Sequence, residues 1–135
     1  DPGDIMLSPA VRRIAIANPR LAPYGLAARQ VLQAWGLWDE VQSRLVRGEN
    51  IAQTLQFVAS GNAQAGFVAL SQLRAMSDPP AGVQLTLPAS LHEPIAQHAI
   101  LLRRGEAAEA LAAYLRGERA RELIVAAGYD MPGGD

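Results

Sequence analysis

The chain has 135 residues, of which 50% are hydrophobic, and its formal net charge is -1 at pH 7. This length predicts one domain, or a domain with an appended piece, and the composition supplies enough apolar side chains for a core. The charge gives no electrostatic case for binding nucleic acid or an acidic membrane surface. The absence of cysteine excludes disulfides and thiolate metal sites.

The N-terminal residues Asp1–Asp4 carry neither the basic segment nor the apolar core of a signal peptide, so we expect no signal peptide in this chain. No apolar run approaches the ~20 residues of a membrane-spanning helix. Two origins fit such a start: an intracellular protein, or a chain from which a leader has been removed.

Residues Ile14–Trp35 predict a strand, a turn and a helix, in that order. The apolar run Ile14–Ala17 is typical of a buried parallel strand, and Pro19 ends it. The helix is predicted from Pro23 to Trp35, because proline is tolerated at the first helical position and apolar residues then recur at helical spacing. Gly36 is a natural end for this helix.

The first-turn N–H groups of a helix have no partner inside it, and the helix dipole adds a partial positive charge at the same end. A helix start that follows a strand is therefore a natural anion-binding site. The alternative is a βα turn that binds nothing, and for this stretch taken alone the alternative is the more frequent case.

A second helix start follows a brief strand predicted at 45–46, which comes after a short helix predicted at 37–44. Asn50 is a good N-cap, and Gln53 lies three residues later, at the spacing of a capping box. The helix predicted at 51–60 therefore offers a second set of N–H groups directly after a strand. The alternative is a structural helix that is only well capped.

The remaining residues continue the alternation of predicted strands and helices. Strands are predicted at 65–70, 83–87 and 94–102, and helices at 71–75, 107–115 and 118–126. This order predicts an α/β fold with a mostly parallel sheet flanked by helices. The βα turns of such a sheet gather at the carboxyl ends of its strands, where ligands bind. Two helix starts at one crevice favour an anion site more than either does alone.

No catalytic or metal-binding motif accompanies this pattern. His92 and His98 lack metal-ligand spacing, and the chain contains no nucleophile elbow, phosphate-binding loop or dinucleotide-binding glycine motif. The carboxylates are dispersed along predicted helix faces. We therefore expect a protein that is not an enzyme and that carries no cofactor.

Three stretches together resemble a known family: IAIANPRLAPYG (14–25), GENIAQTLQFVASGNA (48–63) and AGFVALSQ (65–72). They look like the periplasmic molybdate-binding proteins of ABC importers, in the same order and spacing. The ending AAGYD (126–130) matches as well. The resemblance extends from about residue 11 to residue 130.

The resemblance implies one lobe of a type II periplasmic-binding-protein fold. Residues 1–104 would form the second, anion-binding lobe, and residues 105–135 the C-terminal helices that pack at the junction with the first lobe. It further implies a periplasmic solute-binding protein that holds molybdate or tungstate through neutral hydrogen bonds, with no other metal, and delivers it to an ABC transporter permease. The first lobe precedes anything present here, so the chain would carry half of the oxyanion site.

Carried over by position, the two backbone N–H donors are those of Tyr24 and Ile51. Three neighbours would support them: Pro23, Gly25 and Asn50. Some family members also donate a tyrosine hydroxyl from the strand at 67–69, but here that position is Ala69. The side chain of Tyr24 is an alternative hydroxyl donor or a packing residue.

Two other functions compete with transport. Transcription regulators reuse the same fold as an oxyanion- or small-ligand-sensing lobe, although no helix-turn-helix or basic stripe supports that interpretation here. An enzyme with a Rossmann-like layer is disfavoured by the missing motifs.

Overall fold

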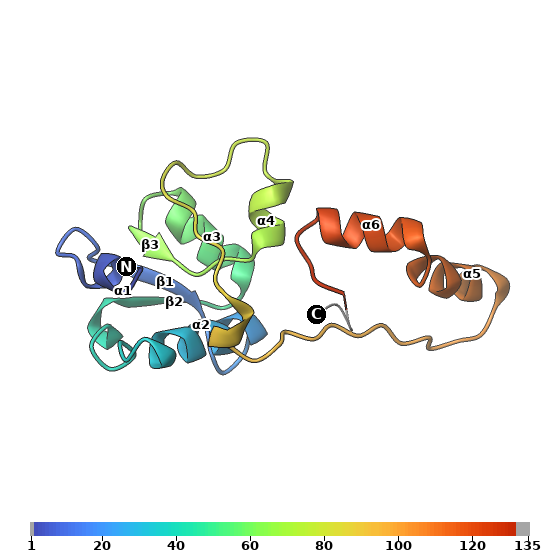
Figure 1. Cartoon of the computed structure of the whole chain (residues 1–135), viewed down its shortest axis with the longest axis horizontal. Helices are drawn as coiled ribbons and strands as arrows, with labels where there is room; N and C mark the ends of the chain where they lie inside the picture. Colours follow the sequence, from blue (N-terminus) through green and yellow to red (C-terminus); the bar gives the residue numbers. More distant parts are fainter. Residues whose placement is uncertain (1, 132–135) are drawn as a thin grey trace. The chain divides into compact units, whose positions relative to one another are not determined.

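A computed structural model describes residues 2–131, and contacts within the chain define two compact units, Asp1–Ile95 and Ala96–Asp135 (Figure 1). The predicted boundary between 104 and 105 concerns the lobes of the resembled family and stays a prediction. The elements of the first unit, in chain order, are α1 (Pro2–Leu7), β1 (Ile14–Ala17), α2 (Pro23–Ala34), the 3-10 helix η1 (Gln42–Arg44), β2 (Leu45–Gly48), α3 (Ile51–Ala59), β3 (Ala65–Gly66), α4 (Leu70–Ala75) and the 3-10 helix η2 (Ala89–Leu91).

The three strands form a parallel sheet in the order β2-β1-β3, which confirms the predicted sheet type. Ile14 pairs with Leu45 on one side and with Ala65 on the other, and Ala17 pairs with Gly48. The chain steps outward from β1 to β2 and returns past β1 to β3. Because such crossovers are right-handed, α2 and α3 cover opposite faces of the sheet (Figure 1).

The core lies between the sheet and α2. Every residue of β1 is fully buried, as expected for a central strand covered on both faces. Full burial of a large aliphatic side chain contributes about 1.5–3 kcal/mol. The buried cluster consists of Val11, Ile14, Ile16, Ala28, Leu32, Leu37 and Val41.

Gly36 follows α2 with a φ of 72°, which confirms it as the end of that helix. The helix predicted at 37–44 is wrong, because this stretch forms turns and only the short η1. Val41 N–H donates to the Leu37 carbonyl at 3.1 Å, but Arg44 N–H then donates to the Val41 carbonyl at 2.9 Å. The bond from Arg44 to Val41 spans three residues, as in a 3-10 helix, instead of the four of an α-helix. The α-helical pattern therefore does not continue.

Two predicted strands, at 83–87 and 94–102, are absent. Both segments are extended chain without a neighbouring strand in residues 2–131. Val83 is 93% exposed and Leu102 is 89% exposed. Their apolar residues satisfy the local pattern, but a strand also needs a partner for its N–H and C=O groups.

The strand predicted at 65–70 is shortened to Ala65–Gly66, with one further bond from Phe67 N–H to the Ala15 carbonyl at 2.9 Å. The following helix begins at Leu70, one residue before the predicted start at 71, with Ala69 as its N-cap residue. The side-chain oxygen of Gln72 accepts the Ala69 N–H at 3.3 Å in place of a hydroxyl cap.

The second unit contains the two predicted helices, α5 (Glu106–Leu115) and α6 (Glu118–Ala126), and the structure shows that they contact each other. Ala120 is buried at 2% exposure, and the exposed ion pair of Arg119 with Glu122 measures 2.9 Å. Several apolar side chains of this pair stay exposed: Leu111, Tyr114, Leu115, Leu123 and Val125. Within residues 2–131, no helix has the length and hydropathy needed to cross a bilayer.

Candidate functional site

The two predicted helix starts leave the sheet from neighbouring positions. Ala17 and Gly48 are paired residues at the carboxyl ends of β1 and β2, and each strand leads directly into its helix. Asn18 N–H donates to the Gly48 carbonyl at 2.7 Å and joins the two turns. The structure thus brings the turns that contain Tyr24 and Ile51 to the same edge of the sheet.

Asn18 organises the turn before α2. Its carbonyl accepts the N–H groups of Leu21 and Ala22 at 3.0 and 2.9 Å, and its side-chain oxygen accepts that of Arg20 at 3.0 Å. The Ala22 carbonyl then accepts the N–H groups of Gly25 and Leu26, at 2.9 and 3.1 Å. These donors are therefore used by the helix itself.

Tyr24 and Pro23 lie in the first turn of α2, with Pro23 at the predicted N-terminal position. The side chain of Tyr24 is half-buried, and the residue takes part in an interaction within the chain. Gly25 is buried against the end of β1. An added Cβ there would overlap the Ala17 carbonyl oxygen and lie 2.7 Å from its carbon, so only glycine lets α2 begin this close to the strand.

Asn50 caps α3 as predicted, with its side-chain oxygen accepting the Gln53 N–H at 2.9 Å. The reciprocal bond of the expected capping box is displaced by one residue. The Gln53 side-chain oxygen accepts the Glu49 N–H at 2.7 Å instead of the Asn50 N–H. The Asn50 carbonyl also accepts two bonds from Thr54.

The start of α3 retains three backbone donors. In the part of the chain that the structure describes, the N–H groups of Asn50, Ile51 and Ala52 donate to no protein acceptor. They lie at the end of the helix where the dipole is positive. The N–H group of Ile51 is therefore open, and so is that of Ala52, which sequence reasoning did not single out; the role of Ile51 as an anion donor stays a prediction.

We expect Asn50→Ala to lower the free energy of unfolding by about 1 kcal/mol, because it removes the cap of the Gln53 N–H. Urea unfolding followed by tryptophan fluorescence measures this change, since both tryptophans of the chain, Trp35 and Trp38, lie in the first unit. Asn50→Asp keeps an acceptor and should retain most of the stability. An unchanged midpoint for Asn50→Ala would contradict the capping role.

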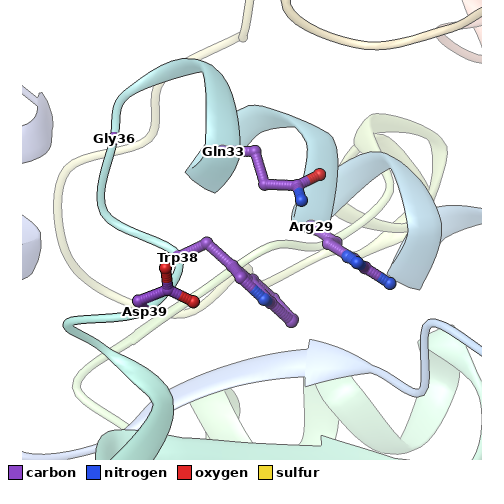
Figure 2. A pocket seen from close by; sticks show the side chains of 5 residues that line it. All are labelled: Arg29, Gln33, Gly36, Trp38 and Asp39. Carbon is purple, nitrogen blue, oxygen red and sulfur yellow. The ribbon is translucent and has the colours of Figure 1, made fainter.

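A separate pocket of about 310 Å³ lies beside α2 and the segment after it (Figure 2). The Arg29 guanidinium stands over the Trp38 ring, 5.3 Å from its centroid, and Asp39 lines the same pocket. Because a carboxylate offsets the cation, this pocket is less suited to a small anion than the helix starts are. Gln33 and Gly36 complete its lining, so none of the predicted site residues belongs to it.

Among residues 2–131, no three His, Asp or Glu side chains gather as a metal-binding group. The Nδ1 atom of His92 lies 2.8 Å from the Glu93 carbonyl oxygen, and this contact ties the ring to its own loop. The Glu93 N–H donates to the side chain of Gln30 on α2 at 3.0 Å. These polar groups therefore hold the loop at 89–93 against α2.

A parallel sheet with helices on both faces and two helix starts at one edge defines a lobe of the type II periplasmic-binding fold. Residues 3–130 match the family described as bacterial extracellular solute-binding protein, and the chain belongs to this family. The description of this family names extracellular solute binding.

Two of the similar proteins are named molybdate-binding proteins. The chain is 46% identical over 134 residues to the molybdate-binding protein ModA of Azotobacter vinelandii, a match that covers 97% of the chain and 53% of that protein. It is 39% identical over 127 residues to ModA of Rhodobacter capsulatus, covering 92% of the chain and 49% of that protein.

The solved structure of the periplasmic molybdate-binding protein of Azotobacter vinelandii matches with a TM-score of 0.84 and 38% identity, over 98% of this chain and 59% of that one. These matches confirm the resemblance and the fold predicted from the sequence. The chain spans about half the length of the curated relatives it matches.

Proposed function

We propose that this chain supplies half of an oxyanion site for molybdate or tungstate, in a solute-binding protein that serves an ABC transporter permease. Two relatives at 46% and 39% identity are molybdate-binding proteins. The observation that carries the proposal is the open set of N–H groups at the start of α3, beside the α2 turn. The site of this chain is the carboxyl edge of its sheet.

The chemistry of the site is hydrogen bonding without a formal cation. Molybdenum reaches the protein as a tetrahedral dianion, so its oxygens are the atoms that the protein contacts. Each N–H bond to a charged acceptor contributes about 1.5–3 kcal/mol, and the helix dipole adds to it. Neutral donors hold the dianion in this scheme, and no cofactor or catalytic group takes part.

Within this site, Ile51 and Tyr24 are the proposed backbone donors. The first is supported by its open N–H group, and the second by its place in the adjoining turn. Asn50 fixes the α3 start, and Pro23 and Gly25 fix that of α2.

The remaining donors would come from the part of the relatives' length that this chain does not span. That part is also the proposed partner for the exposed apolar side chains of α5 and α6, as expected of large apolar patches. A periplasmic location follows the named Azotobacter structure. The transcription-regulator alternative is not favoured, because the family and the relatives are solute-binding proteins.

Ile51→Pro tests the α3 donor, because it removes one N–H group at the first helical position, where proline is tolerated. Asn50 already has the extended conformation, with φ -147° and ψ 173°, that proline requires of the preceding residue. We expect the affinity for molybdate to fall about 10- to 100-fold, the equivalent of one charged hydrogen bond.

The measurement is an NMR titration of the chain's backbone amides with sodium molybdate, with sodium chloride as the ionic-strength control. Tungstate should give the same amide shifts as molybdate, and Ile51→Val, which keeps the N–H, should bind like the unaltered chain. Amide shifts that are the same for molybdate and chloride would refute the oxyanion site. Nanomolar one-to-one binding by the monomeric chain in calorimetry would refute the half-site.

A further inference from the structure

Thr54 is the one residue among residues 2–131 that is both polar and fully buried, with 0% of its surface exposed. Its hydroxyl donates to the Asn50 carbonyl oxygen at 2.9 Å, and its backbone N–H donates to the same oxygen at 3.2 Å. A valine of nearly the same shape would fill the space without burying a hydroxyl. The position of the Asn50 carbonyl oxygen, which accepts both bonds, indicates a role for the Thr54 hydroxyl.

The acceptor belongs to the peptide group that joins Asn50 to Ile51. A trans peptide is planar, and its C=O and N–H groups point in opposite directions. Two bonds from Thr54 draw the Asn50 carbonyl into the helix. The Ile51 N–H is therefore directed out of the helix start.

Gly48 lies close to the same group. A Cβ at Gly48 would lie 2.8 Å from the Thr54 hydroxyl and 3.0 Å from the Asn50 carbonyl oxygen, so the end of β2 packs directly on this pair. The Gly48 carbonyl in turn accepts the Asn18 N–H at 2.7 Å. One glycine thus connects the α2 turn to the peptide that carries the Ile51 donor.

We propose that Thr54 is a positioning residue, whose buried hydroxyl aims the Ile51 N–H at the oxyanion. The inference rests on the proposed function of the α3 start. It assigns a role to a side chain that does not touch the ligand and acts through the Asn50 carbonyl.

The test compares Thr54→Val with Thr54→Ser in the full chain. Without any anion, the valine variant should shift the Ile51 amide resonance and speed its hydrogen exchange, because one of the two bonds that fix the peptide is lost. On titration with sodium molybdate, its affinity should fall about five- to tenfold, the equivalent of one net hydrogen bond. The serine variant keeps the hydroxyl and should restore both properties.

Leu55→Ala is the matched control, because it weakens the half-buried face of α3 and leaves the hydroxyl in place. If Leu55→Ala lowers the affinity as much as Thr54→Val does, or if serine fails to restore the Ile51 amide, the positioning role is refuted. The spectra recorded without anion test the role of Thr54 independently of molybdate binding. If the unaltered chain does not respond to molybdate but Thr54→Val still shifts the Ile51 amide, the proposed function is refuted. The role of the Thr54 hydroxyl in orienting the Ile51 N–H is then still supported.

Discussion

Replacing Gly25 with alanine is expected to lower the free energy of unfolding by about 2–3 kcal/mol, in the range of other overpacked cores. The added methyl group would overlap the Ala17 carbonyl oxygen and lie 2.7 Å from the carbonyl carbon of Asn18. Both are backbone atoms, so no side chain can rotate to make room. Relief requires α2 to move away from β1, which also displaces the turn that holds Tyr24.

Urea unfolding followed by far-UV circular dichroism, which reports the helices of both units, measures this loss. Gly105→Ala is the matched control, because no atom lies within 4 Å of the Cβ it would add and its φ of 165° is ordinary extended backbone. The control should change the free energy of unfolding by less than about 0.5 kcal/mol. Equal midpoints for the two variants would show that α2 does not depend on this close approach.

Arg44→Met is expected to lower the free energy of unfolding by about 2–3 kcal/mol, because hydrogen bonds from a charged donor are stronger than those between neutral groups. The Arg44 Nη1 atom lies 3.2 to 3.4 Å from four carbonyl oxygens, those of Met6, Leu7, Ser8 and Val11. Two of these carbonyls end α1, where a cation also complements the helix dipole. Methionine keeps most of the apolar stem and removes the donors.

Hydrogen exchange localises this effect. Residues 2–11 should exchange faster in Arg44→Met, together with a lower urea midpoint. Arg47→Met serves as the control, because Arg47 is exposed and its guanidinium makes one side-chain bond, to Gln42 at 3.1 Å. Protection of residues 2–11 that survives the loss of Arg44 would contradict this anchoring role.

The elements that sequence analysis predicted correctly are those whose signals are local. Pro23 and Asn50 mark helix starts because each acts on its own first turn, and the burial of β1 follows from a run of four apolar residues. The strands predicted at 83–87 and 94–102 failed because pairing depends on a neighbour that no local pattern specifies.

Residues that make contacts across distant parts of the chain were missed for a related reason. Arg44 contacts Met6 across 38 positions, and Gly48 contacts Thr54 only once α3 has folded against β2. The hydroxyl four residues after the Asn50 cap was a usable signal for Thr54, since such a threonine can bond back to the capping carbonyl. Tyr24 and Ile51 were placed at one edge by strand order, and their role as donors stays a prediction.

A ligand held by main-chain N–H groups makes few demands on the side chains that face it. Any residue except proline presents the same donor at position 51, so the surface of the site can vary while the ligand stays the same. The positions with the least freedom lie one layer behind: at Gly25 and Gly48 an added methyl group would meet backbone atoms, and at Thr54 the hydroxyl bonds the Asn50 carbonyl. Searches for lobes of this kind should weigh those supporting positions above the proposed donor residues.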